Sequence, residues 1–132
     1  MRAALLVADH IAAHPDGTFS LIRGGIDQVL VPPNTPAVLS AHVLARITVE
    51  TSECGIQHAF EVRVINEDGA LIGGNVSGAF TIEKGKRAAN VIVGINLVLP
   101  KVGRYEVSIL INSEQRDVWP IAVSEQSEPR RS

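Results

Sequence analysis

The chain has 132 residues, of which 45% are hydrophobic and 20% are charged, and its net charge is −2. This length suits one domain with a real core, and the composition excludes a wholly disordered chain. Aromatic residues make up only 4%, so the core must be aliphatic and a base-stacking surface is not expected. The negative charge also argues against a phosphate-backbone binder, and we expect no nucleic-acid partner.

The location of the protein is predicted from its cysteine and its N-terminus. Cys54 is the single cysteine and has no partner for an internal disulfide, which favours a reducing compartment. The apolar run from Ala3 to Ala8 stops at Asp9 and is shorter than the core of a typical signal peptide. No apolar run approaches the ~18 residues of a membrane span. We therefore expect a cytoplasmic protein with no membrane partner.

The first elements in the chain are an expected hairpin and a bend. Alanines in residues 3–14 favour a helix, but the turn signal His-Pro-Asp-Gly at 14–17 and a strand at 18–22 favour a hairpin. Strand and helix both stay open for residues 3–14. The glycine pair at 24–25 predicts a bulge or bend, after which the strand at 26–31 is expected to cross to a second sheet.

The middle of the chain predicts three strands. A proline-rich connection at 32–36 leads to a long strand at 38–50, followed by strands at 57–66 and 71–83. Asn66 to Gly69 reads as a tight hairpin turn. Glycines at 73, 74 and 78 interrupt the third strand and indicate a bulge or a close contact.

The clearest pattern lies between residues 90 and 112. Apolar residues alternate on both sides of a break at Pro100 and Gly103, as in two half-buried strands. Tyr105 follows this break as a tyrosine does in the corner of immunoglobulin-like domains, although simple packing at a strand start explains it equally well. A last strand is expected at 116–123, and Pro120 marks it as an edge or bulged strand.

These elements predict an all-β fold, an antiparallel β-sandwich that is immunoglobulin-like or jelly-roll-like, with eight or nine strands. One domain is expected over residues 1–123, followed by a disordered polar tail at 124–132. The expected core residues are Phe60, Val62, Val64, Phe80, Val91, Val93, Ile95, Leu97, Tyr105, Val107 and Ile109.

The segment from Asp16 to Gly25, Asp-Gly-Thr-Phe-Ser-Leu-Ile-Arg-Gly-Gly, resembles a family of small uncharacterised bacterial proteins. Asp9, the proline-rich connection, the Asp68-Gly69 hairpin and the Gly103-Arg104-Tyr105 strand extend the similarity over nearly the whole chain. Arg23 departs from the pattern, because a small residue is expected there. The resemblance implies a bacterial source and a β-sandwich, and it brings no catalytic residues.

Three groups of side chains are candidates for chemistry. Asp9, His10, His14 and Asp16 could hold a metal ion, but on a strand the two histidines lie about 13 Å apart. Cys54, His58 and Glu53 form the only local nucleophilic set, without a family signature. Lys84, Lys86 and Arg87 could contact an anion at a hairpin tip, although charged tips also keep an edge soluble. We expect no enzyme, no cofactor and no metal.

The remaining expectation is a binding or assembly module that self-associates through a sheet face or edge, most simply as a homodimer. Several strands are apolar on both faces, and the surplus lies either under loops or at an interface. The possible interface residues are Leu44, Ile92, Val98 and Leu110. Alternatives are a hetero-partner, a small ligand held between the sheets, or a metal-dependent enzyme that uses the N-terminal His/Asp cluster, with His10, His14 and Asp16 on the metal.

Overall fold

The computed structural model describes residues 1–126, and residues 127–132 lie outside its description. The described chain forms nine strands and one turn of 3-10 helix, Thr51–Glu53. The strands are β1 (Arg2–Ala13), β2 (Phe19–Gly24), β3 (Gln28–Val31), β4 (Ala37–Thr48), β5 (Gln57–Asn66), β6 (Val76–Thr81), β7 (Ala88–Leu99), β8 (Gly103–Ile111) and β9 (Glu114–Glu125). A one-residue bridge from Leu71 to Ile65 adds a tenth extended segment, one more than the upper expectation. β9 also runs two residues past the expected domain boundary at 123.

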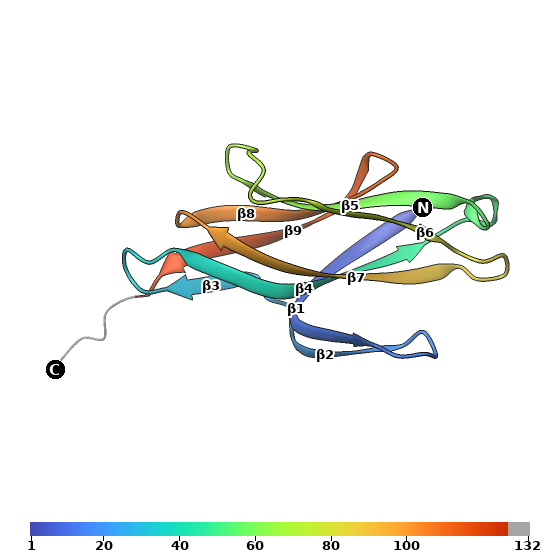
Figure 1. Cartoon of the computed structure of the whole chain (residues 1–132), viewed down its shortest axis with the longest axis horizontal. Coiled ribbons are helices and arrows are strands. Elements are labelled where there is room, and N and C mark those ends of the chain that lie inside the picture. The colour runs from blue at the N-terminus through green and yellow to red at the C-terminus, as the bar shows by residue number, and fades with distance from the viewer. Residues whose placement is uncertain (127–132) are drawn as a thin grey trace.

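The strands form two sheets, with orders β2-β1-β4-β7 and β3-β9-β8-β5-β6 (Figure 1). The fold is therefore all-β, as expected, and residues 3–13 belong to a strand, with His14 just beyond its end. The prediction of a wholly antiparallel arrangement is wrong at one place, because β3 pairs parallel to β9. β3 follows β2 after a crossover between the sheets, so no tight turn forces it to be antiparallel to its neighbour.

The crossover occurs at the paired glycines, as expected. Gly25 adopts a φ of +88°, a conformation that favours glycine. The N–H groups of Gly25 and Ile26 both donate to the Val7 carbonyl, and Trp119 Nε1 donates to the Ile26 carbonyl at 2.7 Å. These bonds fix the direction in which the chain leaves one sheet for the other.

One aliphatic core lies between the sheets, because alternate residues of both sheets point toward each other. Its fully buried members include Val7, Val43 and Ile47 from the first sheet and Val107 and Ile109 from the second. The expected core is confirmed: six of its eleven residues are buried, and the other five pack against them.

Tyr105 closes the connection between β7 and β8, which belong to different sheets. Its hydroxyl donates to the Lys101 carbonyl at 2.7 Å and accepts from the Lys101 N–H at 3.2 Å. The tyrosine itself is buried. The corner geometry is therefore present, beyond mere packing at a strand start.

Two strands, β6 and β9, differ in part from their predictions. β6 is only six residues long, and Gly78 lies opposite Phe60, whose ring would be 2.8 Å from a Cβ at that position. β9 was expected to be an edge or a bulged strand; its register against β8 shifts between Ile109 and Leu110, as in a bulge, but it lies inside its sheet even though it contains Pro120. β9 pairs with β3 only from Ala122 onward, so at Pro120 one side of β9 has no neighbouring strand. The N–H that proline lacks is therefore not needed for the pairing with β3.

Candidate functional site

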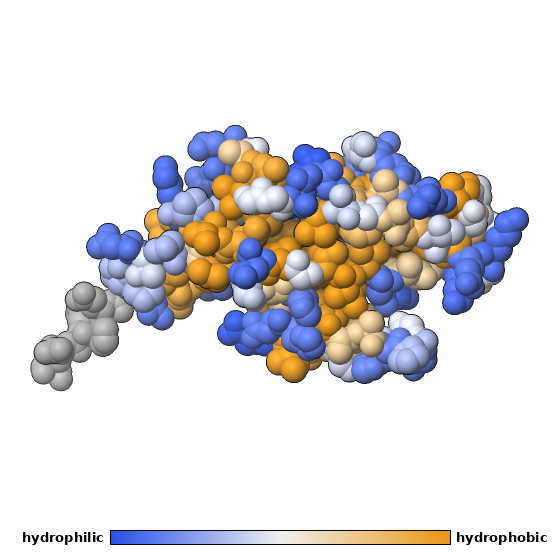
Figure 2. Space-filling view, in the orientation of Figure 1, coloured by the Kyte–Doolittle hydropathy of each residue, from blue (hydrophilic) through white to orange (hydrophobic). Residues whose placement is uncertain are grey.

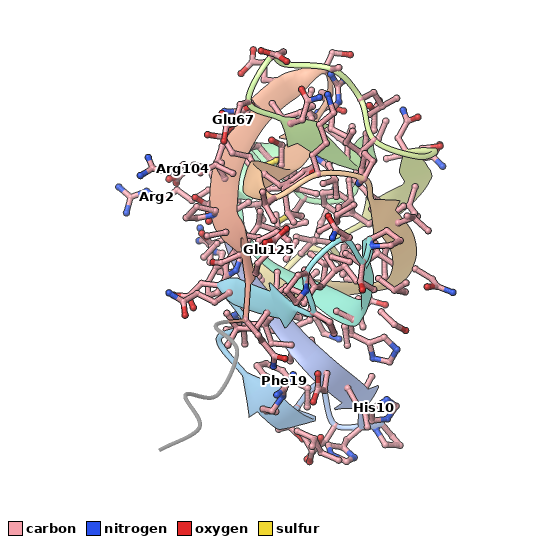
Figure 3. All side chains as sticks on the ribbon, turned by 90° about the vertical axis from the view of Figure 1, so that its left-hand side faces the viewer. Arg2, His10, Phe19, Glu67, Arg104 and Glu125 are labelled. Atoms are coloured by element: carbon pink, nitrogen blue, oxygen red, sulfur yellow. The ribbon has the colours of Figure 1, made fainter. Side chains whose placement is uncertain are left out.

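The hairpin of β1 and β2 folds against the outer face of the first sheet. β1 pairs with β4 only as far as Ala8, opposite His42, and the rest of β1 diverges with β2 as its partner. A second, smaller cluster of apolar side chains fills the space between the hairpin and the sheet. Its buried members are Ala8, Ile11 and Leu44, and its partly buried members are Leu6, Phe19 and Ile92. Figure 3 labels His10 and Phe19 on this hairpin, below the two sheets. We call this group the hairpin cluster.

Polar bonds hold the hairpin to the sheet at two points. The Ile11 N–H donates to His42 Nδ1 at 2.8 Å, beyond the last β1–β4 pair. At the hairpin tip, Asn90 Nδ2 on β7 donates to the Gly17 carbonyl at 3.2 Å. Side chains of the sheet thus replace backbone pairing where β1 has left the ladder.

A groove of about 250 Å³ lies between the hairpin tip and the sheet. Phe19 and Thr18 line it from the hairpin, while Arg46, Asn90 and Ile92 line it from the sheet. Arg46 Nη1 donates to Asn90 Oδ1 at 3.1 Å, so the Asn90 amide links the guanidinium to the hairpin. We call this space the hairpin groove.

The free edge of β7 is the second surface feature. The twelve residues of β7 pair with β4 on one side, and within residues 1–126 no backbone group pairs with the other side. β7 contains no charged residue and no proline. Apolar side chains gather in a band across the middle of the face in Figure 2, where β7 runs in Figure 1.

The other three edges are shorter. β2 has six residues, and Arg23 breaks its regularity with a φ of +52°. β3 has four residues and β6 has six, including Gly78. Short, irregular or charged edges resist pairing with another chain, whereas a long, uncharged edge favours it.

The structure separates the residues of the predicted metal set. His10 stacks on His42 with ring centroids 4.7 Å apart, His14 Nε2 lies 2.7 Å from Ser20 Oγ, and Asp9 pairs with Arg23 at 2.6 Å. Among the residues described, no three His, Cys, Asp or Glu side chains converge as metal ligands would.

Asp16, the fourth member of that set, closes the hairpin tip. The hydroxyl and the N–H of Thr18 both donate to its carboxylate, and these bonds lower the pKa of Asp16. Asp16 thus holds its own turn together.

Cys54 and His58 are buried but are not hydrogen-bonded to each other. His58 Nε2 lies 2.8 Å from the Glu53 carbonyl, and its Nδ1 accepts from Asn112 Nδ2 at 3.0 Å. The Cys54 thiol faces the Lys86 carbonyl at 3.3 Å. Both ring nitrogens are used by structural bonds, so His58 is not placed as a base for Cys54.

Glu53 anchors the start of the chain. Its carboxylate accepts from the Glu50 N–H at 2.8 Å and lies 3.2 Å from the Met1 ammonium. The Glu50 N–H is the main cause that lowers the pKa of Glu53, and the ammonium adds to it.

The predicted interface residues do not share one surface. Leu44 is only 3% exposed and lies in the hairpin cluster beside the half-buried Ile92. Val98 is 57% exposed, opposite Val38 on β4. Leu110 belongs to the other sheet. Part of the apolar surplus therefore lies under the hairpin, and Val98 remains open at the β7 edge.

The predicted basic tip lies between β6 and β7. Lys86 pairs with Glu83 at 3.7 Å, and both side chains are largely exposed. Arg87 uses its carbonyl to accept from the Val49 N–H. Lys84 packs beside Gly55. The three cations share one turn, and none of them lines the hairpin groove.

Sequence reasoning expected an open sheet edge without assigning it to residues 88–99, and it missed the groove. No charged residue occurs between Arg87 and Lys101, so this strand lacks the charges that usually keep an edge strand from pairing with another chain. Arg46 and Asn90 are far apart in sequence, and only the register that places them opposite each other reveals the groove.

The fold and its surfaces define a two-sheet all-β domain with a folded-back hairpin and one long open edge. The chain belongs to a family of unknown function, DUF6941, which matches residues 3–124. No curated protein matches the chain, and no solved structure matches it either. Within residues 1–126, no helix is long and apolar enough to cross a membrane.

Proposed function

We propose that this protein is a non-enzymatic binding module that forms a homodimer through the free edge of β7. The observation that carries the proposal is a strand of twelve residues without charge or proline and with one unpaired side. Two such edges in antiparallel pairing would join two four-stranded sheets into one sheet across the dimer.

A second copy suits this edge better than an unrelated chain. Antiparallel pairing about a two-fold axis brings the same strand against itself, and such isologous dimers are the commonest oligomers. Because β7 carries no charge, no like charges meet in this pairing. Val98 and the half-buried Val93 and Ile92 supply apolar side chains near the join.

The finer fold and setting of the protein are proposed with its function. The Tyr105 bonds support an immunoglobulin-like sandwich over a jelly-roll-like one. The free, buried Cys54 supports a cytoplasmic location. The bacterial source is the implication of the family resemblance alone. A ligand between the sheets is disfavoured, because aliphatic side chains fill that space.

Light scattering on the purified chain tests the proposal. We expect a mass of twice 14.1 kDa, with dissociation below about 10 μM. Val98→Lys should give a folded monomer, because a lysine at the end of the edge opposes pairing with a second copy. Val38→Lys is the matched control: Val38 is 60% exposed and directly opposite Val98, but it lies on β4, on the side of β7 away from its free edge.

The pair of variants separates edge pairing from face packing. A dimer that is lost in Val98→Lys but retained in Val38→Lys supports pairing at the edge. Equal loss in both variants would assign the interface to the outer face of the sheet. A wild-type monomer at concentrations well above 10 μM would refute self-association and leave a hetero-partner for the β7 edge.

A further inference from the structure

The hairpin groove is lined by polar and apolar groups in about equal share, with Arg46 as its one strong cation. Phe19 and Ile92 are both half-buried and face the groove from opposite walls, and Ala88 and Ala89 extend the apolar part along β7. Arg46 contributes its guanidinium from β4. Ligand sites in proteins combine apolar walls with a few polar groups that fix orientation, and this groove offers both kinds of group.

Arg46 donates one hydrogen bond within residues 1–126, which leaves most of its N–H groups available to a ligand. None of the ion pairs among residues 1–126 includes Arg46, and its one hydrogen bond goes to the neutral Asn90 amide. A guanidinium carries five N–H donors in a planar fork, which matches a carboxylate in a bidentate pair. The bond to Asn90 holds this fork at the groove while other donors remain available.

The acid at the hairpin tip does not pair with Arg46. Asp16 does not line the groove, and its carboxylate accepts two bonds from Thr18. These bonds lower the pKa of Asp16 and keep it negative, so it opposes an anion from outside the groove. Arg46 is the charged side chain that lines the groove itself, and Arg87, which precedes the groove residue Ala88, is also positive, so the balance of charge at the groove favours an anionic ligand.

We propose that the hairpin groove binds a small organic carboxylate, with the carboxylate on Arg46 and a short apolar or aromatic tail between Phe19 and Ile92. The volume of about 250 Å³ limits the ligand to a small acid. The bound tail would add contacts between the hairpin and the sheet, so the ligand would also hold the hairpin down. The site lies on the face of the sheet, and the proposal does not depend on pairing at the β7 edge.

Titration of the full chain with benzoate, followed by amide chemical shifts, tests the site. We expect saturable shifts at Thr18, Phe19 and Asn90 with a dissociation constant of about 1 mM. Benzamide, which has the same ring without the charge, should bind at least tenfold more weakly. Inorganic phosphate, which has the charge without the ring, should also bind at least tenfold more weakly.

Two arginine variants locate the carboxylate. Arg46→Gln should weaken benzoate binding at least tenfold while the amide spectrum stays that of the folded protein. Arg104→Gln, an exposed arginine on β8 in the other sheet, should leave binding unchanged. Arg46→Lys should bind with intermediate strength, since it keeps the charge and loses the fork.

Three results would overturn the proposal. One is equal binding of benzoate and benzamide, which would show that the negative charge of the ligand does not contribute to its affinity. Another is equal binding of phosphate and benzoate, which would show that the apolar walls contribute nothing. The third is an Arg46→Gln variant that binds benzoate as the wild type does. The oligomeric state measured by light scattering is a separate readout, so failure of this proposal and failure of the dimer are distinguishable.

Discussion

The inter-sheet core and the hairpin cluster share one strand but differ in how they are closed. The first half of β1 places Leu5 and Val7 in the core, between two sheets. The second half places Ala8 and Ile11 in the hairpin cluster, which a two-stranded hairpin covers from one side. A large apolar interior and a thin cover over a few residues are expected to open at different free energies. The molecule should therefore lose the hairpin contacts without losing its fold.

Truncation of the core should have the largest effect. Ile109 is fully buried toward the end of β8, and Ile109→Ala should reduce the free energy of unfolding by about 3–4 kcal/mol. Chemical denaturation followed by fluorescence of Trp119 measures this loss. A loss below about 1 kcal/mol would mean that the site collapses around the smaller side chain or is not part of the cooperative core.

The same change in the hairpin cluster should cost less and act locally. Ile11 is 4% exposed, and Ile11→Ala should remove about 1–2 kcal/mol, mostly from the opening of the hairpin. Hydrogen exchange should accelerate at β2 amides and stay unchanged at β8 amides.

Ile22 provides the matched control for Ile11. It lies on the same hairpin but is 64% exposed, so Ile22→Ala should change exchange rates little. If Ile11→Ala accelerated exchange in both sheets alike, the hairpin and the core would form one cooperative unit.

Acid should weaken both regions by a smaller amount. The folded-state pKa values of Asp16 at the hairpin tip and Glu53 near the N-terminus are lowered by hydrogen bonds. A lowered pKa means that the stabilisation is present at neutral pH and is lost as pH falls from about 4.3 through the folded-state values.

Neutral variants assign the acid effect to its two sources. In Glu53→Gln, the free energy of unfolding should fall less between neutral and acid pH than in the wild type. In Asp16→Asn, only the hydrogen exchange of hairpin amides should change. If the loss of stability at acid pH were the same in both variants as in the wild type, other carboxylates would dominate it.

Strand positions were predictable because alternation and turn residues are local signals. The hairpin at 14–17, the bend at Gly24 and Gly25 and the core residues of β7 and β8 all follow from neighbours in the sequence. The parallel pairing of β3 with β9 was not predictable, since nothing local in either strand specifies a partner so distant in the chain.

The candidate sites were less predictable than the fold. Leu44 reads as an outward apolar residue, but only the folded-back hairpin reveals that it is covered. The groove depends on Arg46 and Asn90 meeting across a register that alternation alone leaves open. Cys54, His58 and Glu53 are neighbours in sequence, yet the carbonyls around them take up the bonds that catalysis would require.

The position of β9 has a kinetic consequence. Asp117 accepts from the Leu5 N–H at 2.8 Å, Trp119 holds the Ile26 carbonyl, and Ala122 lies opposite Gln28. β9 is thus the strand that fastens β1 and the crossover into β3 to the second sheet. Closing contacts over such long sequence separations is slow, so the protein should fold on the slow side for its size. Until β9 docks, the edge of β8 is unpaired and the apolar residues of β1 are not covered, so the folding chain should be prone to aggregation and should bind chaperones.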